Sequence, residues 1–121
     1  LNIEVNNNDS VMLKSLAGTR LGIWVAHGEG RFDFPEGESR YKIPVKYSYE
    51  GYPGNPNGSP HSAAGIVSED GRHLAMMPHL ERAVLPWQWA HYPADRNTDD
   101  VTPWLEAFVN ARNWINTNNA E

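Results

Sequence analysis

The sequence contains no cysteine in 121 residues. This absence excludes a disulfide framework, thiolate ligands for a metal, and any thiol nucleophile supplied by the chain itself. Positive charge is also scarce, because 10 Lys and Arg residues face 15 Asp and Glu residues and the formal net charge is -5. The sequence has neither a basic cluster typical of nucleic-acid binding nor an apolar run of about 18 residues that could cross a membrane. We therefore expect no nucleic-acid or membrane partner and a cytoplasmic location.

The length and composition fit one globular domain over residues 1–121. Hydrophobic residues make up 40% of the chain and charged residues 21%, with five Trp and five Tyr. Single domains commonly contain about 100–150 residues, so one core is expected. The chain starts with Leu1, and residues 1–5 (LNIEV) alternate between apolar and polar as a strand interior does. We expect a piece of a longer protein that is incomplete at its N-terminal side.

Apolar runs and turn signals predict a chain rich in strands. Residues 21–26 (LGIWVA) form a near-continuous apolar run, which is typical of a central strand buried on both faces. The alternation across residues 45–49 predicts a half-exposed outer strand. Residues 63–67 and 73–77 flank the pair Asp70-Gly71, which suits a type I′ turn, so a β-hairpin is expected there.

The rest of the chain is predicted to contain an irregular loop and one helix. Residues 52–60 (YPGNPNGSP) are too rich in proline and glycine for a sheet ladder. Thr102 and Pro103 suit the N-cap and first position of a helix that extends to about Ile115. Trp87 and Trp89 are expected to fill the core against this helix. The expected apolar side of the helix consists of Trp104, Leu105, Phe108, Val109, Ala111 and Ile115.

His79 and Glu81 form the strongest candidate for chemistry. They follow Pro78, which favours an extended path, and residues two apart in an extended segment point the same way. The carboxylate could then accept the ring N–H and leave the other ring nitrogen as a base toward a nucleophile, as in acyl transfer. A His-x-Glu pair also arises by chance as an ordinary loop ion pair. The spacing alone leaves both interpretations open.

Three motifs together favour the catalytic interpretation of His79 and Glu81 over the ordinary ion pair. Residues 76–82 (MMPHLER), 26–31 (AHGEGR) and 52–59 (YPGNPNGS) resemble the phosphoribosylformylglycinamidine synthase family, the large amidotransferase-ligases of purine synthesis. The resemblance runs from about Val11 to Trp114. It implies an α/β fold, namely the C-terminal portion of a flavodoxin-like class I glutamine amidotransferase domain, here strand-rich with one C-terminal helix.

The resemblance also implies a reaction. In this family a Cys-His-Glu triad hydrolyses glutamine, and an ATP-dependent ligase domain uses the ammonia to convert formylglycinamide ribonucleotide to the amidine. His79 is then the general base and Glu81 its orienting partner, whereas the cysteine would lie upstream of the residues seen here. The family usually has proline between the two, so Leu80 predicts altered loop stiffness. ATP and Mg²⁺ would bind in the ligase domain of the parent enzyme, with no cofactor in this chain.

The resemblance implies partners and support residues as well. The partners would be glutamine, the upstream half of the amidotransferase domain and the ligase domain. The chain alone is expected to lack glutaminase activity and, because strands would be missing, to self-associate. Six residues are candidates for substrate binding or support of the site. They are His27, Glu29, Arg31, Asn55, Asn57 and Ser59.

Plainer interpretations of the same residues stay open. His27 could cap a strand end, and residues 55–59 could form a turn whose side chains bond their own backbone. A stand-alone binding or regulatory module would use the Trp87–Trp89 segment as an aromatic docking surface. A self-contained hydrolase would use Ser59 or Ser62, although neither lies in a G-x-S-x-G elbow. The five histidines lack metal-ligand spacing, so no metal site is expected.

Overall fold

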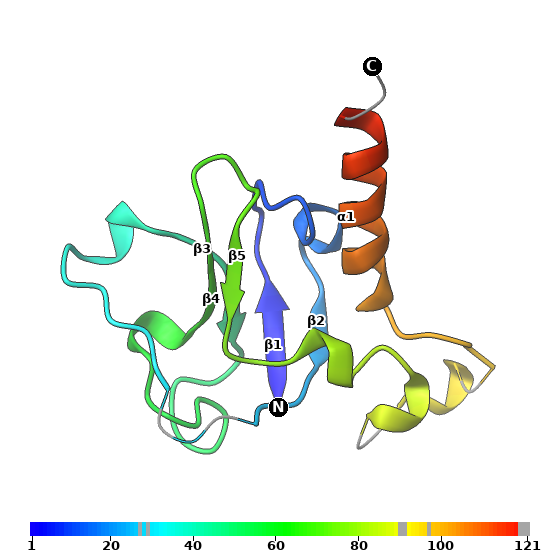
Figure 1. The fold of residues 1–121 in the computed structure, drawn as a ribbon. Helices are drawn as coiled ribbons and strands as arrows, with labels where there is room; N and C mark the ends of the chain where they lie inside the picture. Colours follow the sequence, from blue (N-terminus) through cyan, green and yellow to red (C-terminus); the bar gives the residue numbers. More distant parts are fainter. Residues whose placement is uncertain (27, 29, 90–91, 97, 119–121) are drawn as a thin grey trace.

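A computed structural model describes residues 1–26, 28, 30–89, 92–96 and 98–118 (Figure 1). Five strands form one antiparallel sheet with the order β2-β1-β3-β4-β5. The strands are β1 (Asn2–Val5), β2 (Arg20–Gly22), β3 (Lys42–Tyr47), β4 (Ala63–Val67) and β5 (Leu74–Met76). The helix α1 (Leu105–Asn118) lies at the β2 side of the sheet, beside the 3-10 helix η1 (Lys14–Leu16) (Figure 1). The predicted strand-rich architecture with one C-terminal helix is confirmed.

Five further 3-10 helices lie in the connections. They are η2 (Glu38–Arg40), η3 (Pro60–Ser62), η4 (Leu80–Arg82), η5 (Pro86–Gln88) and η6 (Ala94–Arg96). Among the described residues, no helix is long and apolar enough to cross a membrane.

The apolar run at residues 21–26 is not the central strand that the sequence predicts. β2 ends at Gly22 and is an edge strand, paired only with β1 within the sheet. Just after β2, Ile23 is 4% exposed and belongs to the same hydrophobic cluster as Trp104, whose ring Nε1–H donates to the Gly22 carbonyl at 2.7 Å. The run is therefore buried at Ile23 by this cluster and not by strands on both sides.

The predicted outer strand instead occupies the centre of the sheet. β3 pairs with β1 on one side and β4 on the other, and Val45 is completely buried. Lys46 made this strand look half-exposed, but its ammonium group bonds Glu38 at 2.7 Å. The charged end of a long side chain can thus reach a carboxylate while its strand stays internal.

The hairpin of β4 and β5 is confirmed, whereas the predicted type I′ turn is wrong. Ser68 N–H donates to His73 O at 2.9 Å and Gly71 N–H donates to Ser68 O at 3.0 Å. Gly71 has φ of +74°, but Asp70 does not have the positive φ that a type I′ turn requires. The Asp70 carboxylate instead accepts bonds from the Ser68 hydroxyl and the Arg72 N–H, which stabilises a longer loop.

The helix begins at Leu105, two residues after the predicted first position at Pro103, and ends beyond the predicted Ile115. Thr102 Oγ1 accepts the Trp104 N–H at 3.3 Å, which is an N-cap contact, and α1 continues to Asn118. Trp104 is fully buried, and so is Ala107, which the expected apolar side did not include. Phe108, Val109 and Ile115 keep 39–50% of their surface exposed, so that side is only partly covered.

The two tryptophans of the aromatic segment behave differently. Trp89 packs against the core, and its ring N–H donates to Ala83 O at 3.0 Å. Trp87 is 78% exposed, so the prediction that it fills the core is wrong. Trp87 lies within the 3-10 helix η5 and points away from the core, whereas Trp89, just after η5, lies on the inner side.

Candidate active site

The backbone fixes His79 where the chain leaves β5. Met77 N–H donates to Ala64 O at 2.9 Å, which continues the sheet pairing beyond the strand. His79 N–H then donates to Trp24 O at 2.9 Å, in an isolated antiparallel bridge. His79 is therefore held between the hairpin and the segment that follows β2.

The side chains of His79 and Glu81 are in direct contact. Nδ1 of His79 lies 2.5 Å from Oε1 of Glu81. They meet by a different route from the one predicted, because only His79 is extended, with φ of -109° and ψ of 104°, and the chain then turns into η4. Glu81 reaches the ring from the first turn of that 3-10 helix.

The electrostatics of the pair favour one arrangement of protons. The hydrogen bond from His79 lowers the pKa of Glu81, assisted by its own backbone N–H and by the charges of His79 and Arg82. An ionised carboxylate can only accept, so Nδ1–H of His79 is the donor. Nε2 has no hydrogen-bond partner among the described residues, and the His79 side chain is 32% exposed. The ring can thus exchange a proton at Nε2 with a group that approaches it.

Leu80 anchors the pair to the core. Its side chain is only 6% exposed and belongs to the hydrophobic cluster that includes Trp104. Its carbonyl accepts the Ala83 N–H at 3.0 Å, while His79 O accepts the Arg82 N–H at 3.3 Å. Burial of the residue between them keeps His79 and Glu81 on the outer side of one short turn.

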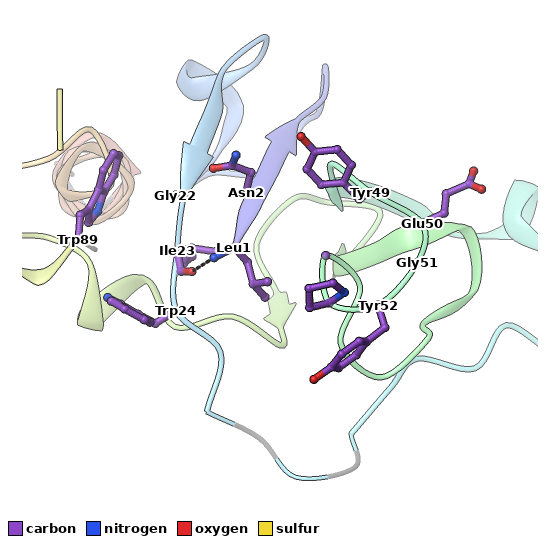
Figure 2. Close-up of a pocket in the computed structure, with 12 residues that line it drawn as sticks. Leu1, Asn2, Gly22, Ile23, Trp24, Tyr49, Glu50, Gly51, Tyr52 and Trp89 are labelled. Atoms are coloured by element: carbon purple, nitrogen blue, oxygen red, sulfur yellow. Dashed lines mark hydrogen bonds between the residues drawn. The ribbon is translucent and has the colours of Figure 1, made fainter. Parts of the chain in front are cut away.

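An apolar recess of about 760 Å³ is lined by Trp24, the residue that bonds the His79 backbone. Trp24, whose carbonyl holds His79, forms part of one wall with Trp89, and Tyr49 and Tyr52 lie across from them (Figure 2). Leu1 lies between these walls, with its terminal amino group bonded to Ile23 O at 3.2 Å. Trp24 is 41% exposed and Tyr52 is 84% exposed. The recess presents aromatic surface, and one of its wall residues, Trp24, is joined to the backbone of the candidate base.

The candidate support residues divide into two groups. His27 and Glu29 lie outside the described residues, and Arg31 is exposed and forms no ion pair with a described residue. Asn57 instead bonds two backbone carbonyls of the other motif, because its Nδ2 donates to Gly28 O at 3.1 Å and Gly30 O at 2.9 Å. The structure therefore joins the two loops that the sequence motifs singled out separately.

Asn55 and Ser59 stabilise the loop itself. Asn55 Nδ2 donates to Ser59 O at 2.9 Å, and Ser59 N–H donates to Asn55 Oδ1 at 3.1 Å. Both side chains are at least 95% buried. The plain interpretation of a loop that bonds its own backbone is thus correct for Asn55 and Ser59. Asn57, in the same loop, bonds carbonyls outside it.

The alternative chemistries find no support in the described part of the chain. Neither Ser59 nor Ser62 has a histidine ring nitrogen within hydrogen-bond reach there, and the neighbouring His61 pairs with Glu38 at 3.3 Å. No group of three or more His, Asp or Glu residues among those described is placed to hold a metal ion.

Residues 1–115 match the family model of the CobB/CobQ-like glutamine amidotransferase domain. The chain belongs to this family. It is 46% identical over 124 residues to phosphoribosylformylglycinamidine synthase of Homo sapiens and 44% identical over 127 residues to a probable chloroplastic/mitochondrial form from Arabidopsis thaliana. Each alignment covers 93% of this chain and 9% of the relative. The predicted resemblance is confirmed.

A solved structure supports the same assignment. The chain superposes on a structure of PurLQS from Thermotoga maritima with a TM-score of 0.65 and 25% sequence identity. The match covers 95% of this chain and 46% of that one. The predicted fold class, part of an α/β glutamine amidotransferase, is therefore confirmed.

Proposed function

We propose that this chain supplies the general base and its orienting carboxylate to a glutaminase. The observation that carries the proposal is the 2.5 Å contact between His79 Nδ1 and Glu81 Oε1, which leaves Nε2 available. Membership of a glutamine amidotransferase family supports glutamine as the substrate. His79 and Glu81 are accordingly the second and third members of a Cys-His-Glu triad.

The proposed chemistry follows the protons at Nε2. A thiolate attacks the glutamine carboxamide carbon, and His79 gives its Nε2 proton to the departing amine, so that ammonia leaves and a thioester forms. Nε2 then takes a proton from the attacking water, and collapse of the second tetrahedral intermediate yields glutamate and regenerates the thiolate. The Glu81 carboxylate stabilises the His79 ring when the ring is protonated. Its hydrogen bond with Nδ1–H also holds the ring in one orientation.

The thiol comes from outside these 121 residues, since the sequence has no cysteine. The longer relatives support this proposal, because this chain aligns with only 9% of their length. The apolar recess fits as the contact surface for the thiol-bearing part of the amidotransferase. Trp24 lines the recess and also bonds the His79 backbone, so a segment packed there would bring its residues close to the base.

We further propose that the ammonia is used for ATP-dependent amidine formation in purine biosynthesis. The similarity to proteins named phosphoribosylformylglycinamidine synthase supports this step. ATP and Mg²⁺ would bind to a ligase part outside this chain. The partners of these residues are therefore the thiol-bearing part of the amidotransferase and the ligase part.

The exposed ring of Trp87 favours a second role. Tryptophan is enriched among the residues that anchor protein–protein contacts, and Trp87 is 78% exposed. Substitution of Trp87 by serine would then weaken assembly with the ligase part and leave the glutaminase rate unchanged. This role is compatible with the first, because no hydrogen bond joins Trp87 to His79 or Glu81 among the described residues.

The substitution Glu81→Gln in the complete amidotransferase tests the main proposal. The amide cannot hold the ring as a charged acceptor, so glutamine hydrolysis should fall by about 10- to 100-fold, while ammonia supplied directly should still support amidine formation. The matched control is Glu69→Gln on the hairpin loop, which should leave both rates unchanged. Full glutamine hydrolysis by Glu81→Gln would refute the assigned role.

A further inference from the structure

Trp24 makes two hydrogen bonds to different parts of the chain. Its backbone carbonyl accepts the N–H of His79 at 2.9 Å. Its ring Nε1–H donates to the carbonyl of Gln88, the last residue of η5. The first bond holds the candidate base, and the second holds Trp24 itself to a separate segment. Trp24 therefore links the backbone of His79 to η5.

The carbonyl that accepts the Trp24 ring belongs to a well-bonded residue. Oε1 of Gln88 accepts the Leu85 N–H at 2.8 Å, and the Gln88 N–H donates to Leu85 O at 2.9 Å. These reciprocal bonds close η5. Trp89 follows directly, and a Cβ atom placed on Gly22 would lie 3.8 Å from its ring, an ordinary contact distance. The chain at the end of η5 thus meets the chain at the end of β2 at two points.

Ala83 connects η4 to the residues that follow η5. It is fully buried, and its N–H donates to Leu80 O at 3.0 Å. Its carbonyl accepts the Trp89 ring N–H at 3.0 Å and the Thr102 hydroxyl at 2.5 Å. These contacts form a closed circuit, which passes through His79, Trp24, Gln88, Trp89, Ala83 and Leu80. Two of its links are tryptophan N–H groups, which a substitution can remove.

The circuit determines how firmly the candidate base is held. His79 and Glu81 lie on one short turn and are bonded to each other, so they move together when the turn moves. Proton transfer requires Nε2 of His79 within about 2.6–3.2 Å of the heavy atom that gives or takes the proton. A displacement of about 1 Å can lower a rate about 100-fold. Because Trp24 O bonds the His79 backbone, movement of Trp24 would displace the base.

We propose that Trp24 is a positioning residue for the His79 base, and that the bond from its ring to Gln88 holds in place the carbonyl that restrains His79. This inference rests on the proposed glutaminase function. The indole ring is a donor only and does not exchange its proton in the reaction, so Trp24 takes no part in the proton transfers. Loss of its ring N–H should therefore slow the chemical step and change glutamine binding little.

The substitution Trp24→Phe in the complete amidotransferase provides the test. Phenylalanine removes the N–H donor but keeps an aromatic ring in the wall of the recess. The kcat of glutamine hydrolysis should fall about fivefold, because one hydrogen bond is lost, while the KM for glutamine changes by less than about twofold. Amidine formation from added ammonia should be unaffected. An unchanged kcat in Trp24→Phe would overturn the proposal.

Trp114→Phe is the matched control. Trp114 lies on α1, where the guanidinium carbon of Arg72 is 5.1 Å from its ring centroid, and it takes no part in the circuit. Its kcat and KM for glutamine should equal those of the wild type. A fall in kcat as large as that of Trp24→Phe would overturn the proposal.

Gln88→Ala separates the bond from the recess. Gln88 is not among the described residues that line the recess, so this substitution loosens the acceptor of the Trp24 ring without changing the wall. Its kcat should fall about threefold. The double variant should be no slower than Trp24→Phe, because the position of the Gln88 carbonyl no longer matters once the donor is gone. Falls that multiply in the double variant would overturn the proposal.

Hydrogen exchange distinguishes positioning from loss of folding. Exchange at the His79 amide should become about tenfold faster in Trp24→Phe, whereas the Met77 amide, which donates to Ala64 O at 2.9 Å, should exchange as in the wild type. Unchanged exchange at His79, or equal acceleration at both amides, would overturn the role of Trp24. Retention of glutamine hydrolysis by His79→Asn would instead refute the glutaminase assignment, whatever the Trp24 variants do.

Discussion

The backbone N–H of His79 donates to the carbonyl of Trp24 at 2.9 Å, which joins the exit of the β4–β5 hairpin to the segment after β2. This bond joins the candidate base to a wall of the apolar recess, because Trp24 lines the recess. One backbone contact thus relates the base and the recess.

The pKa of Glu81 should respond to the loss of His79. The hydrogen bond from the ring lowers this pKa below its ordinary value of 4.5, so its contribution to stability is present above pH 4.5 and lost as the pH falls through the folded pKa. A carboxylate titration by NMR should show Glu81 ionising more acidically than a free glutamate, and His79→Asn should move it back toward 4.5.

The matched control for this titration is His61→Asn. His61 also pairs with a glutamate, Glu38, but lies outside the candidate site. This substitution should leave the Glu81 titration unchanged. A Glu81 pKa that does not depend on His79 would show that the pair is absent in solution.

Leu80 should tolerate proline better than alanine. Leu80→Ala removes a side chain that is 6% exposed and should reduce the free energy of unfolding by about 2–5 kcal/mol. Leu80 is the first residue of η4, where proline is accepted because no backbone N–H is needed. Leu80→Pro should be less destabilising than Leu80→Ala by about 0.4–1 kcal/mol, because the ring restricts the unfolded chain.

Urea denaturation of the two Leu80 variants measures this difference. The Glu81 titration should stay acidic in Leu80→Pro, because the turn still brings the carboxylate to His79. Greater destabilisation by proline than by alanine would mean that the backbone of η4 differs from the one described.

Tyr47 should ionise well above the ordinary pKa of tyrosine. It is 4% exposed in the central strand, and burial raises its pKa to about 12. The unfolded chain loses this proton near pH 10, so stability should fall as the pH rises from 10 to about 12. An ultraviolet titration should show a tyrosinate step near pH 12 whose amplitude is lost in Tyr47→Phe. A titration near pH 12 that is identical in Tyr47→Phe and the wild type would contradict the burial of this ring.

The apolar recess should drive self-association of the isolated chain. Tyr52 is 84% exposed at its rim, and an aromatic ring contributes strongly when it is buried in a contact. Tyr52→Ser should weaken self-association in sedimentation experiments by about tenfold. Ile115→Ser, on the exposed part of α1, is the control and should have little effect. A chain that stays monomeric at high concentration would contradict the prediction.

Local patterns predicted several elements correctly. The alternation in residues 1–5, the apolar stretches beside Gly71 and the Thr102 cap each depend on neighbours in the sequence, and the structure contains β1, the hairpin and α1 there. The His79–Glu81 contact was also predicted, although through an extended segment instead of a 3-10 turn. Such features form from residues a few positions apart, so the sequence carries them directly.

Long-range contacts could not be predicted in this way. The apolar run at residues 21–26 starts in an edge strand, where Trp104, about 80 residues later, bonds the Gly22 carbonyl, and a run of apolar residues looks the same whatever buries it. Lys46 made the central strand look exposed because its pairing with Glu38 leaves no trace in the pattern. The bond between His79 and Trp24 uses only backbone atoms, which every residue has.

The most direct test of the account is the rate of glutamine hydrolysis by His79→Asn in the complete amidotransferase, compared with amidine formation from added ammonia. Asparagine cannot exchange the proton that Nε2 carries, so glutamine hydrolysis should fall by at least about 100-fold while the ammonia-supported reaction keeps the wild-type rate. Glutamine hydrolysis at the wild-type rate would contradict the assignment of His79 as the base.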